Sequence, residues 1–232
     1  MEAAALKAWH TVHSPAVIAF DAQAGALLLE AIEPGTPLIV SMAYPALESV
    51  AGLLSALHGQ SVPGSYPAVG QRVDDLFRSS TKLYERDPRL TALIPYEVYE
   101  EGHALATRLA EQDDEPVLLH GDLTPRNILD GGAERGLVAI DPTPCRGDTA
   151  FDAVDLILWQ ADDLKAIRAR AEVVAASIGV EAGRLHAWCC AFAGMLALEL
   201  AAEGNIPRAR IEALRNLASQ AGTTYGNDGS TA

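Results

Sequence analysis

A short polar loop enclosed by apolar strands lies in the middle of the sequence and constrains the fold more than any other feature. The loop is His120–Asn127 (HGDLTPRN), and a later apolar run leads directly into Asp141. An Asp-Gly-Gly sequence before that run supplies the turn residues of a hairpin. The strands that this pattern predicts are 117–119, 128–129 and 137–140. The hairpin return is expected to bring Asp141 back beside Asn127.

Three oxygen-bearing side chains therefore gather at strand ends. Asp122 opens the loop, and Asn127 follows five residues later, where the next strand starts. Asn127 and Asp141 form a hard, oxygen-only ligand pair suited to Mg²⁺ that carries nucleotide phosphates. Asp122 stays outside the metal and can accept the proton of a substrate hydroxyl. Phosphoryl transfer uses such a set of residues.

The remainder of the chain is mostly helical by its apolar periodicity. Two short apolar runs, Val17–Phe20 and Ala26–Leu29, predict an early β-hairpin, and a connector punctuated by Pro and Gly follows at Glu30–Pro37. Helices are predicted at 44–58, 71–86, 96–112, 150–160, 164–178, 181–203 and 208–219. Because strands come early and in the middle while helices dominate the second half, we expect an α+β fold.

The segment Leu118–Leu156 resembles the core of aminoglycoside phosphotransferases, with His-Gly-Asp in place of the His-Arg-Asp of protein kinases and Ile-Asp-Pro in place of Asp-Phe-Gly. It is similar above all to the streptomycin 6-phosphotransferase and hydroxyurea phosphotransferase family. The resemblance implies a protein-kinase-like fold and ATP- and Mg²⁺-dependent phosphorylation of an alcohol group on a small antibiotic, with streptomycin as the expected substrate. The expected parts are a truncated small lobe with its hinge (1–36), a helical catalytic lobe (37–220) and a disordered tail (221–232).

The resemblance also implies roles for single residues. Asp122 would orient and deprotonate the hydroxyl. The backbone near Glu30 and Ile32, in a stretch that fits the family's fifth strand and hinge, would hold adenine. His120 is expected to brace the loop rather than to do chemistry. Asp152 resembles a buried aspartate that accepts backbone donors from the loop, although an ordinary acid in the first turn of a helix is the simpler alternative.

Carboxylates from the C-terminal helices hold the cationic antibiotic in the resembled family. Asp155, Glu199 and Glu203 are the candidates, and the last two lie one helical turn apart on one face. A solvated helix face explains these acids equally well. The sequence leaves both interpretations open.

The parts of a kinase that precede the lysine-pairing helix are not found in the sequence. The lysines are Lys7, Lys82 and Lys165, the first glycine is Gly25, and no glycine-rich phosphate loop occurs. Glu2 matches the family's lysine-pairing glutamate but has no lysine partner. We expect the chain to be the downstream part of a family member, with impaired activity. The exposed edge of the early hairpin predicts poor solubility or self-association.

Charge and cysteine content bound the partners and the compartment. The 232 residues hold 17 Lys and Arg against 31 Asp and Glu, a formal net charge of −14. This negative charge disfavours nucleic acid as a partner and permits a cationic small molecule. The charge by itself has a simpler explanation, which is that net acidity keeps a protein soluble. The three cysteines form no CxxC pair, which suits a reducing compartment. The longest uncharged apolar run, Ala187–Leu198, has 12 residues, against roughly 20 in a membrane span. We expect a cytoplasmic protein that is not membrane-bound.

Two alternatives remain at this level. Hydroxyurea or another small metabolite would change only the lining of the pocket, which the motifs do not specify. A catalytically silent remnant that binds nucleotide weakly or acts as a binding module would keep the loop without turnover.

Overall fold

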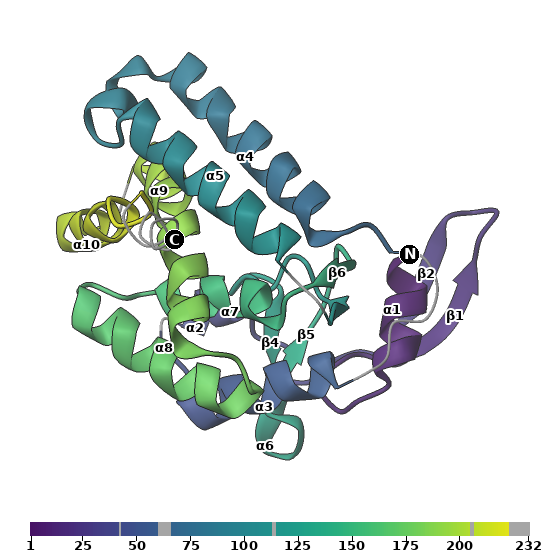
Figure 1. The fold of residues 1–232 in the computed structure, drawn as a ribbon. Coiled ribbons are helices and arrows are strands. Elements are labelled where there is room, and N and C mark those ends of the chain that lie inside the picture. The colour runs from purple at the N-terminus through teal and green to yellow at the C-terminus, as the bar shows by residue number, and fades with distance from the viewer. Residues whose placement is uncertain (42, 60–65, 113–114, 205–206, 223–232) are drawn as a thin grey trace, which may run out of the picture.

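The computed structural model describes residues 1–232 except 42, 60–65, 113–114, 205–206 and 223–232. Helix α1 (Glu2–Trp9) leads into the antiparallel hairpin of β1 (Val17–Asp21) and β2 (Ala26–Leu29). Figure 1 shows this hairpin projecting from the side of the molecule. Ile18, Phe20 and Leu28 are 63%, 52% and 57% exposed, so apolar side chains of the predicted hairpin are open to solvent.

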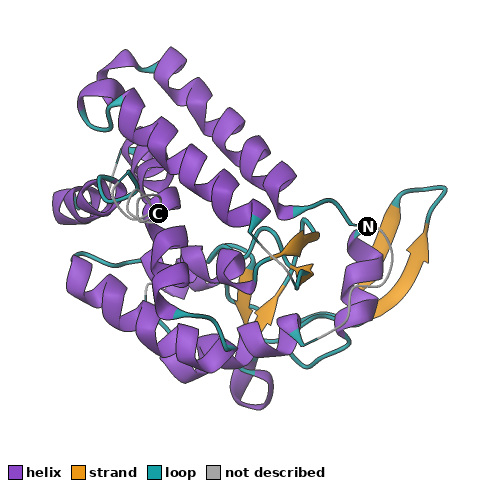
Figure 2. Ribbon diagram, viewed as in Figure 1, coloured by secondary structure: helices purple, strands orange, loops and turns teal. Residues whose placement is uncertain are grey.

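Two small antiparallel ladders form the centre of the molecule, where Figure 2 shows the remaining strands. Strand β3 (Val117–Leu119) pairs with β6 (Cys145–Gly147), and β4 (Ile128–Asp130) pairs with β5 (Leu137–Ala139). The connector after the first hairpin is attached to β4, because Asp130 N donates to Thr36 O and Gly35 N donates to Asp130 O, both at 2.9 Å. The central strands are thereby linked to the N-terminal segment.

Helices surround these ladders on the other sides (Figure 2). Helix α9 (Ala182–Glu203) is at the centre of the helical body, where it contacts α5 (Tyr96–Glu111), α7 (Thr149–Leu158) and α10 (Arg208–Ala218). Helix α4 (Val69–Arg86) packs along α5. Most positions of α9 from Leu185 to Leu198 are buried, so the surrounding core explains the apolar sequence of this helix. The helical body also includes α3 (Leu47–His58), which contacts α8 (Leu164–Ile178).

Helix α9 is also, among the described residues, the one helix long and apolar enough to cross a membrane by length and composition. Two thirds of that stretch, 67%, is buried inside the protein. A buried core helix passes the same test as a membrane span, so this finding is weak evidence for a membrane role.

The structure corrects several predicted elements. The helix expected from residue 44 begins at Leu47, after Pro45, and the one expected from residue 71 begins earlier, at Val69. The predicted Asp-Gly-Gly turn continues into a short helix, α6 (Gly132–Arg135). Three further elements were not predicted: α2 (Leu38–Ser41), the 3₁₀ helix η1 (Pro88–Ala92) and strand β6.

The expected tail boundary at 221 is too early, because Ala221 is fully buried in the core. The rest of the predicted disordered tail, from residue 223, lies outside the described residues. The division of the chain into a small lobe, a catalytic lobe and a tail otherwise stays a prediction.

Candidate active site

Asp122, in the loop between β3 and β4, accepts hydrogen bonds on both carboxylate oxygens, one from the loop and one from α4. Asn127 Nδ2 donates to Asp122 Oδ2 and to Asp122 O, each at 2.9 Å. Arg72, from α4, donates from Nη2 to Asp122 Oδ1 at 2.9 Å and from Nε to Gly121 O at 2.7 Å. The side chain of Asp122 is still 32% exposed, so it remains accessible from the outside.

Asp141 follows β5 and is placed beside the end of the loop by the β4–β5 ladder. Ile140 N donates to Asn127 O at 2.8 Å, which continues the pairing of Ile128 with Ala139 by one position. Asp141 has a left-handed backbone with φ 55 and is exposed. The hairpin return predicted from the sequence is therefore present, and it sets Asn127 and Asp141 at the same strand ends.

These two residues fit a magnesium ion by the chemistry of their donors. The amide nitrogen of Asn127 donates to Asp122, so its amide oxygen is the atom that would bind a metal ion. In the described part of the chain, no three His, Cys, Asp or Glu side chains are arranged to hold a metal ion. Mg²⁺ in phosphoryl-transfer sites is bound by one or two protein oxygens, with water and phosphate completing its shell. The small donor set agrees with that use.

Asp152, in the first turn of α7, holds the start of the loop by accepting hydrogen bonds from its backbone. Its oxygens accept from His120 N at 2.7 Å, from Gly121 N at 2.9 Å and from His58 Nε2 at 3.1 Å. Burial acts to raise the pKa of Asp152, but the hydrogen bond and charge of His58, with the loop donors, lower it below its usual value. An ionised carboxylate therefore lies under the loop. The contact between His58 and Asp152 was not predicted.

His120 is fully buried and is contacted on several sides. Its Nε2 lies 3.0 Å from Ile140 O, and its Nδ1 accepts from Asp122 N at 3.3 Å. Burial is the largest cause of a lowered His120 pKa, so the ring is neutral at pH 7. This environment suits a bracing role rather than proton transfer to a substrate.

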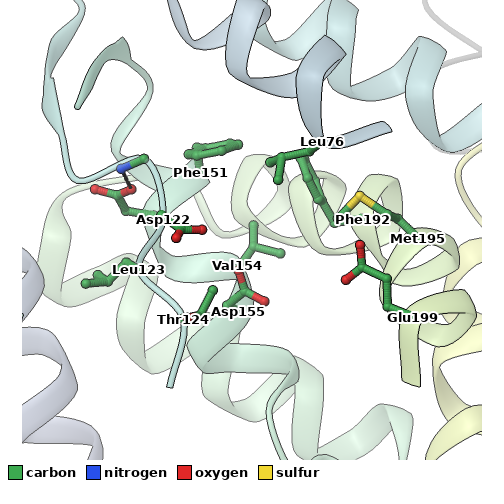
Figure 3. A pocket seen from close by; sticks show the side chains of 12 residues that line it. Leu76, Asp122, Leu123, Thr124, Phe151, Val154, Asp155, Phe192, Met195 and Glu199 are labelled. Atoms are coloured by element: carbon green, nitrogen blue, oxygen red, sulfur yellow. Dashed lines mark hydrogen bonds between the residues drawn. The ribbon is translucent and has the colours of Figure 1, made fainter. Parts of the chain in front are cut away.

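A pocket opens beside Asp122 and is lined by both apolar and acidic side chains. Figure 3 shows Asp155 of α7 and Glu199 of α9 pointing toward one another, with Phe151, Phe192 and Met195 around them. Burial, and then the charge of Asp122, raise the pKa of Asp155 to about 7. Burial, and then the charge of Asp155, raise the pKa of Glu199 to about 7. The two acids, both half-buried, thus line the same pocket.

Glu203, the third acid predicted for this pocket, does not line it. Its side chain is 57% exposed and lies 3.4 Å from Arg126 Nη2. Glu203 lies on the solvent side of α9, and its negative charge also raises the pKa of Glu199. A solvated helix face describes Glu203, whereas Asp155 and Glu199 face the pocket.

The two residues predicted to bind adenine lie in the connector after β2. The carboxylate of Glu30 accepts from Arg135 Nη1 at 2.7 Å and from Ala16 N at 3.0 Å. The side chain of Glu30 is thus used within the protein, and a nucleotide contact there would fall to the backbone. Ile32 is half-buried in the same connector.

Glu2, at the start of α1, lies near Asp141. Burial is the first cause of its raised pKa, and the charge of Asp141 is the second. The N-terminal helix thus approaches the predicted metal site with a carboxylate. No lysine partner for Glu2 is found among the ion pairs of the described residues.

Comparison with known proteins gives the family. The family of aminoglycoside/hydroxyurea antibiotic resistance kinases matches residues 2–204. A hydroxyurea phosphotransferase from Kitasatospora aureofaciens is 30% identical over 193 residues, which are 81% of this chain and 54% of the relative. A streptomycin 6-kinase from Streptomyces griseus is 27% identical over 80% of this chain and 62% of the relative. The chain thus spans little more than half the length of these two relatives.

Solved structures give the fold. A choline/ethanolamine kinase family protein from Mesorhizobium loti superposes with a TM-score of 0.59 and 17% identity, over 98% of this chain and 80% of that one. The choline kinase LicA from Streptococcus pneumoniae, in complex with AMP, gives a TM-score of 0.57 and 16% identity, over 95% and 76%. These likenesses confirm the predicted kinase-like fold of mixed helix and strand. With the match over residues 2–204, the chain belongs to the aminoglycoside/hydroxyurea antibiotic resistance kinase family.

Proposed function

We propose that this chain carries the phosphoryl-transfer site of an ATP-dependent kinase that acts on a hydroxyl group of a small antibiotic, with streptomycin as the first candidate. The observation that carries the proposal is the placement of Asp122, Asn127 and Asp141 around one strand end, beside a pocket that contains two carboxylates. The relatives named hydroxyurea phosphotransferase and streptomycin 6-kinase support the same class of reaction.

The proposed step uses residues of this chain for positioning. Asp122 accepts the proton of the acceptor hydroxyl, whose oxygen forms a bond to the γ-phosphorus of ATP. The bond between that phosphorus and the bridging oxygen breaks, and ADP leaves. Asn127 and Asp141 would hold Mg²⁺, which neutralises phosphate charge when bound. Most of the rate enhancement in such a transfer comes from alignment and charge neutralisation.

The pocket favours a substrate with a cationic group. Asp155 and Glu199 have raised pKa values because both are partly buried and lie near each other and near Asp122. A guanidinium or ammonium group between them would relieve that repulsion and restore both charges. Streptomycin carries guanidinium groups, which fits this pocket. The apolar residues beside the acids leave room for the carbon skeleton.

Hydroxyurea is the second candidate, because the hydroxyurea phosphotransferase relative matches 81% of the chain. It is neutral at pH 7 and would not need the two acids. A chain that binds nucleotide without turnover is the third candidate, and the LicA structure in complex with AMP gives a precedent for a nucleotide on this fold.

The experiment is mass spectrometry of streptomycin and, separately, of hydroxyurea after incubation with Mg-ATP and the 232-residue chain. Asp122→Asn is the control, since it keeps the shape of the side chain but removes the proton acceptor. A gain of one phosphate by streptomycin that is lost in Asp122→Asn is the expected result. Product with hydroxyurea alone would move the substrate to the second candidate, and no product from a folded chain would favour the third.

A further inference from the structure

The ion pair between Arg72 and Asp122 of the loop is one of the less exposed arginine ion pairs of the described residues. Its side chain is 19% exposed and that of Asp122 is 32% exposed. The surface pair Arg78–Asp75 on the same helix has exposures of 70% and 64%. Exposed pairs contribute little because water screens them and the side chains lose freedom. The Arg72 pair is partly withdrawn from water, so its charge acts more strongly on its surroundings.

One edge of the Arg72 guanidinium donates to the side chain of Asp122 and to the backbone carbonyl of Gly121. Nη2 donates to Asp122 Oδ1 at 2.9 Å, and Nε donates to Gly121 O at 2.7 Å. The donors of a guanidinium have a fixed planar geometry, so two simultaneous bonds fix direction as well as distance. A lysine has a single ammonium group and cannot reproduce this edge.

The helix that carries Arg72 is itself held in place. Val69, Val73 and Phe77 form its buried face. Arg146 N, in β6, donates to Pro67 O at 2.9 Å just before the helix begins. Strand β6 pairs with β3, which leads into the loop. The base of α4 and the loop are therefore parts of one packed unit.

Arg72 also balances the charge beside the pocket. Arg72 counteracts the rise in the pKa of Asp155 that burial and the charge of Asp122 produce. Both oxygens of Asp122 have donors, Arg72 on one and Asn127 on the other. Each carboxylate oxygen has two lone pairs, so Asp122 can still accept a substrate hydroxyl.

We propose that Arg72 is a positioning residue for Asp122: its guanidinium and the Asn127 amide hold the carboxylate from opposite sides, in the orientation that receives the hydroxyl proton. This rests on the proposed function, because it assigns Asp122 the role of acceptor. Arg72 acts through Asp122 and stays in place during turnover. A guanidinium that had to leave before substrate could bind would give the opposite kinetics.

The test is steady-state kinetics of Arg72→Gln, Arg72→Lys and Arg72→Ala, with whichever antibiotic the wild-type chain phosphorylates. A hydrogen bond between charged groups corresponds to roughly 10- to 150-fold in rate, so we expect kcat to fall by about that factor in Arg72→Gln. The KM for ATP should be unchanged. The kcat of Arg72→Lys should lie between those of Arg72→Gln and the wild type. Added guanidinium ion should raise the kcat of Arg72→Ala.

Arg78→Ala is the matched control, because Arg78 is an arginine of the same helix that is ion-paired to an aspartate on the surface. Its kcat should equal that of the wild type. An unchanged or higher kcat in Arg72→Gln would overturn the proposal, and so would a loss confined to the KM.

A second measurement separates this inference from the proposed function. In the wild-type chain without ligand, nuclear magnetic resonance should show slower hydrogen exchange at Arg72 Nε than at Arg78 Nε, because the former is bonded to Gly121 O. Equal exchange rates would show that the contact does not exist in solution and would overturn the proposal directly. Slow exchange in a chain that phosphorylates neither antibiotic would mean that the contact stands and the proposed function fails.

Discussion

Trp9 stacks on His120, with ring centroids 5.9 Å apart and an angle of 11° between the ring planes. Trp9 closes the N-terminal helix α1, whereas His120 begins the loop that carries Asp122. Both side chains are buried, at 1% and 0% exposure. The stack therefore joins the N-terminal helix directly to the candidate active site.

We expect this stack to be measurable by a double-mutant cycle of Trp9→Leu and His120→Asn. Aromatic pairs contribute about 0.5–1.5 kcal/mol beyond their buried area, so the coupling energy from urea unfolding should lie in that range. Trp9→Leu keeps an apolar group in the core, and Lys7→Ala in the same helix serves as an exposed control that should change little. Additive effects of the two substitutions would show that the rings do not interact.

Removing the carboxylate under the loop should destabilise the whole fold. Asp152→Ala would leave the donors of His120, Gly121 and His58 without their buried acceptor. Breaking a buried charge network of this kind costs about 3–5 kcal/mol. We expect a loss of that size in the free energy of unfolding, measured with urea.

Asp163→Ala is the matched control for that substitution. Asp163 is also an acid at the N-terminus of a helix, where it accepts from Ala166 N at 2.8 Å on the surface. Loss of such a cap costs about 1 kcal/mol. Equal losses in the two variants would mean that Asp152 acts only as an ordinary acid in the first turn of its helix.

Most helices could be predicted because their apolar residues recur at helical spacing over ten or more positions. Strand β6 could not, since Cys145–Gly147 is three residues long and exists through its pairing with β3. The helix η1 follows from Pro88 and from Asp87, whose side chain accepts from Arg89 N, a local signal that periodicity does not detect. Short elements therefore depend on contacts that lie outside their own sequence.

The same limit applies to the site. The loop and Asp141 could be predicted because their spacing is local and the hairpin return is short. Arg72 is 50 positions from Asp122, and His58 is 94 positions from Asp152. Each looks like an ordinary polar residue of an amphipathic helix, and only tertiary packing brings it to the loop. Glu203 was predicted from the family resemblance and from its spacing to Glu199, but at the end of α9 its side chain is 57% exposed.

The glycine of the His-Gly-Asp sequence should be irreplaceable. Gly121 has φ +77, and a Cβ atom there would overlap the carbonyl oxygen of Thr143. We expect Gly121→Ala to lose activity and stability because backbone atoms cannot move aside. Gly25→Ala is the control, since Gly25 has φ +63 with nothing near the added atom. It should cost only the left-handed strain, about 1–2 kcal/mol. A Gly121→Ala chain as stable as Gly25→Ala would contradict the overlap.

The acids of the pocket predict a pH dependence of stability. The pKa values of Asp155 and Glu199 are about 7 in the folded chain and lie above their ordinary values of 3.8 and 4.5. Between about pH 4 and about pH 7, the folded state therefore binds more protons than the unfolded state. The contribution of these two groups to the free energy of unfolding falls as the pH rises through that window. Glu199→Gln should be more stable than wild type at pH 8, and the difference should shrink at pH 5. A constant difference would show that Glu199 titrates normally.

The same titration should distinguish the two candidate substrates. Below pH 7, Asp155 and Glu199 are protonated in the free protein and attract a cation weakly, so the KM for streptomycin should fall as the pH is raised from 6 to 8. Hydroxyurea is neutral over this range, and its KM should change little. Glu199→Gln should remove much of the pH dependence for streptomycin and leave that for hydroxyurea unaltered. A KM for streptomycin that does not change with pH while kcat varies would show that the two acids do not bind the cation. Other residues would then determine which substrate is bound.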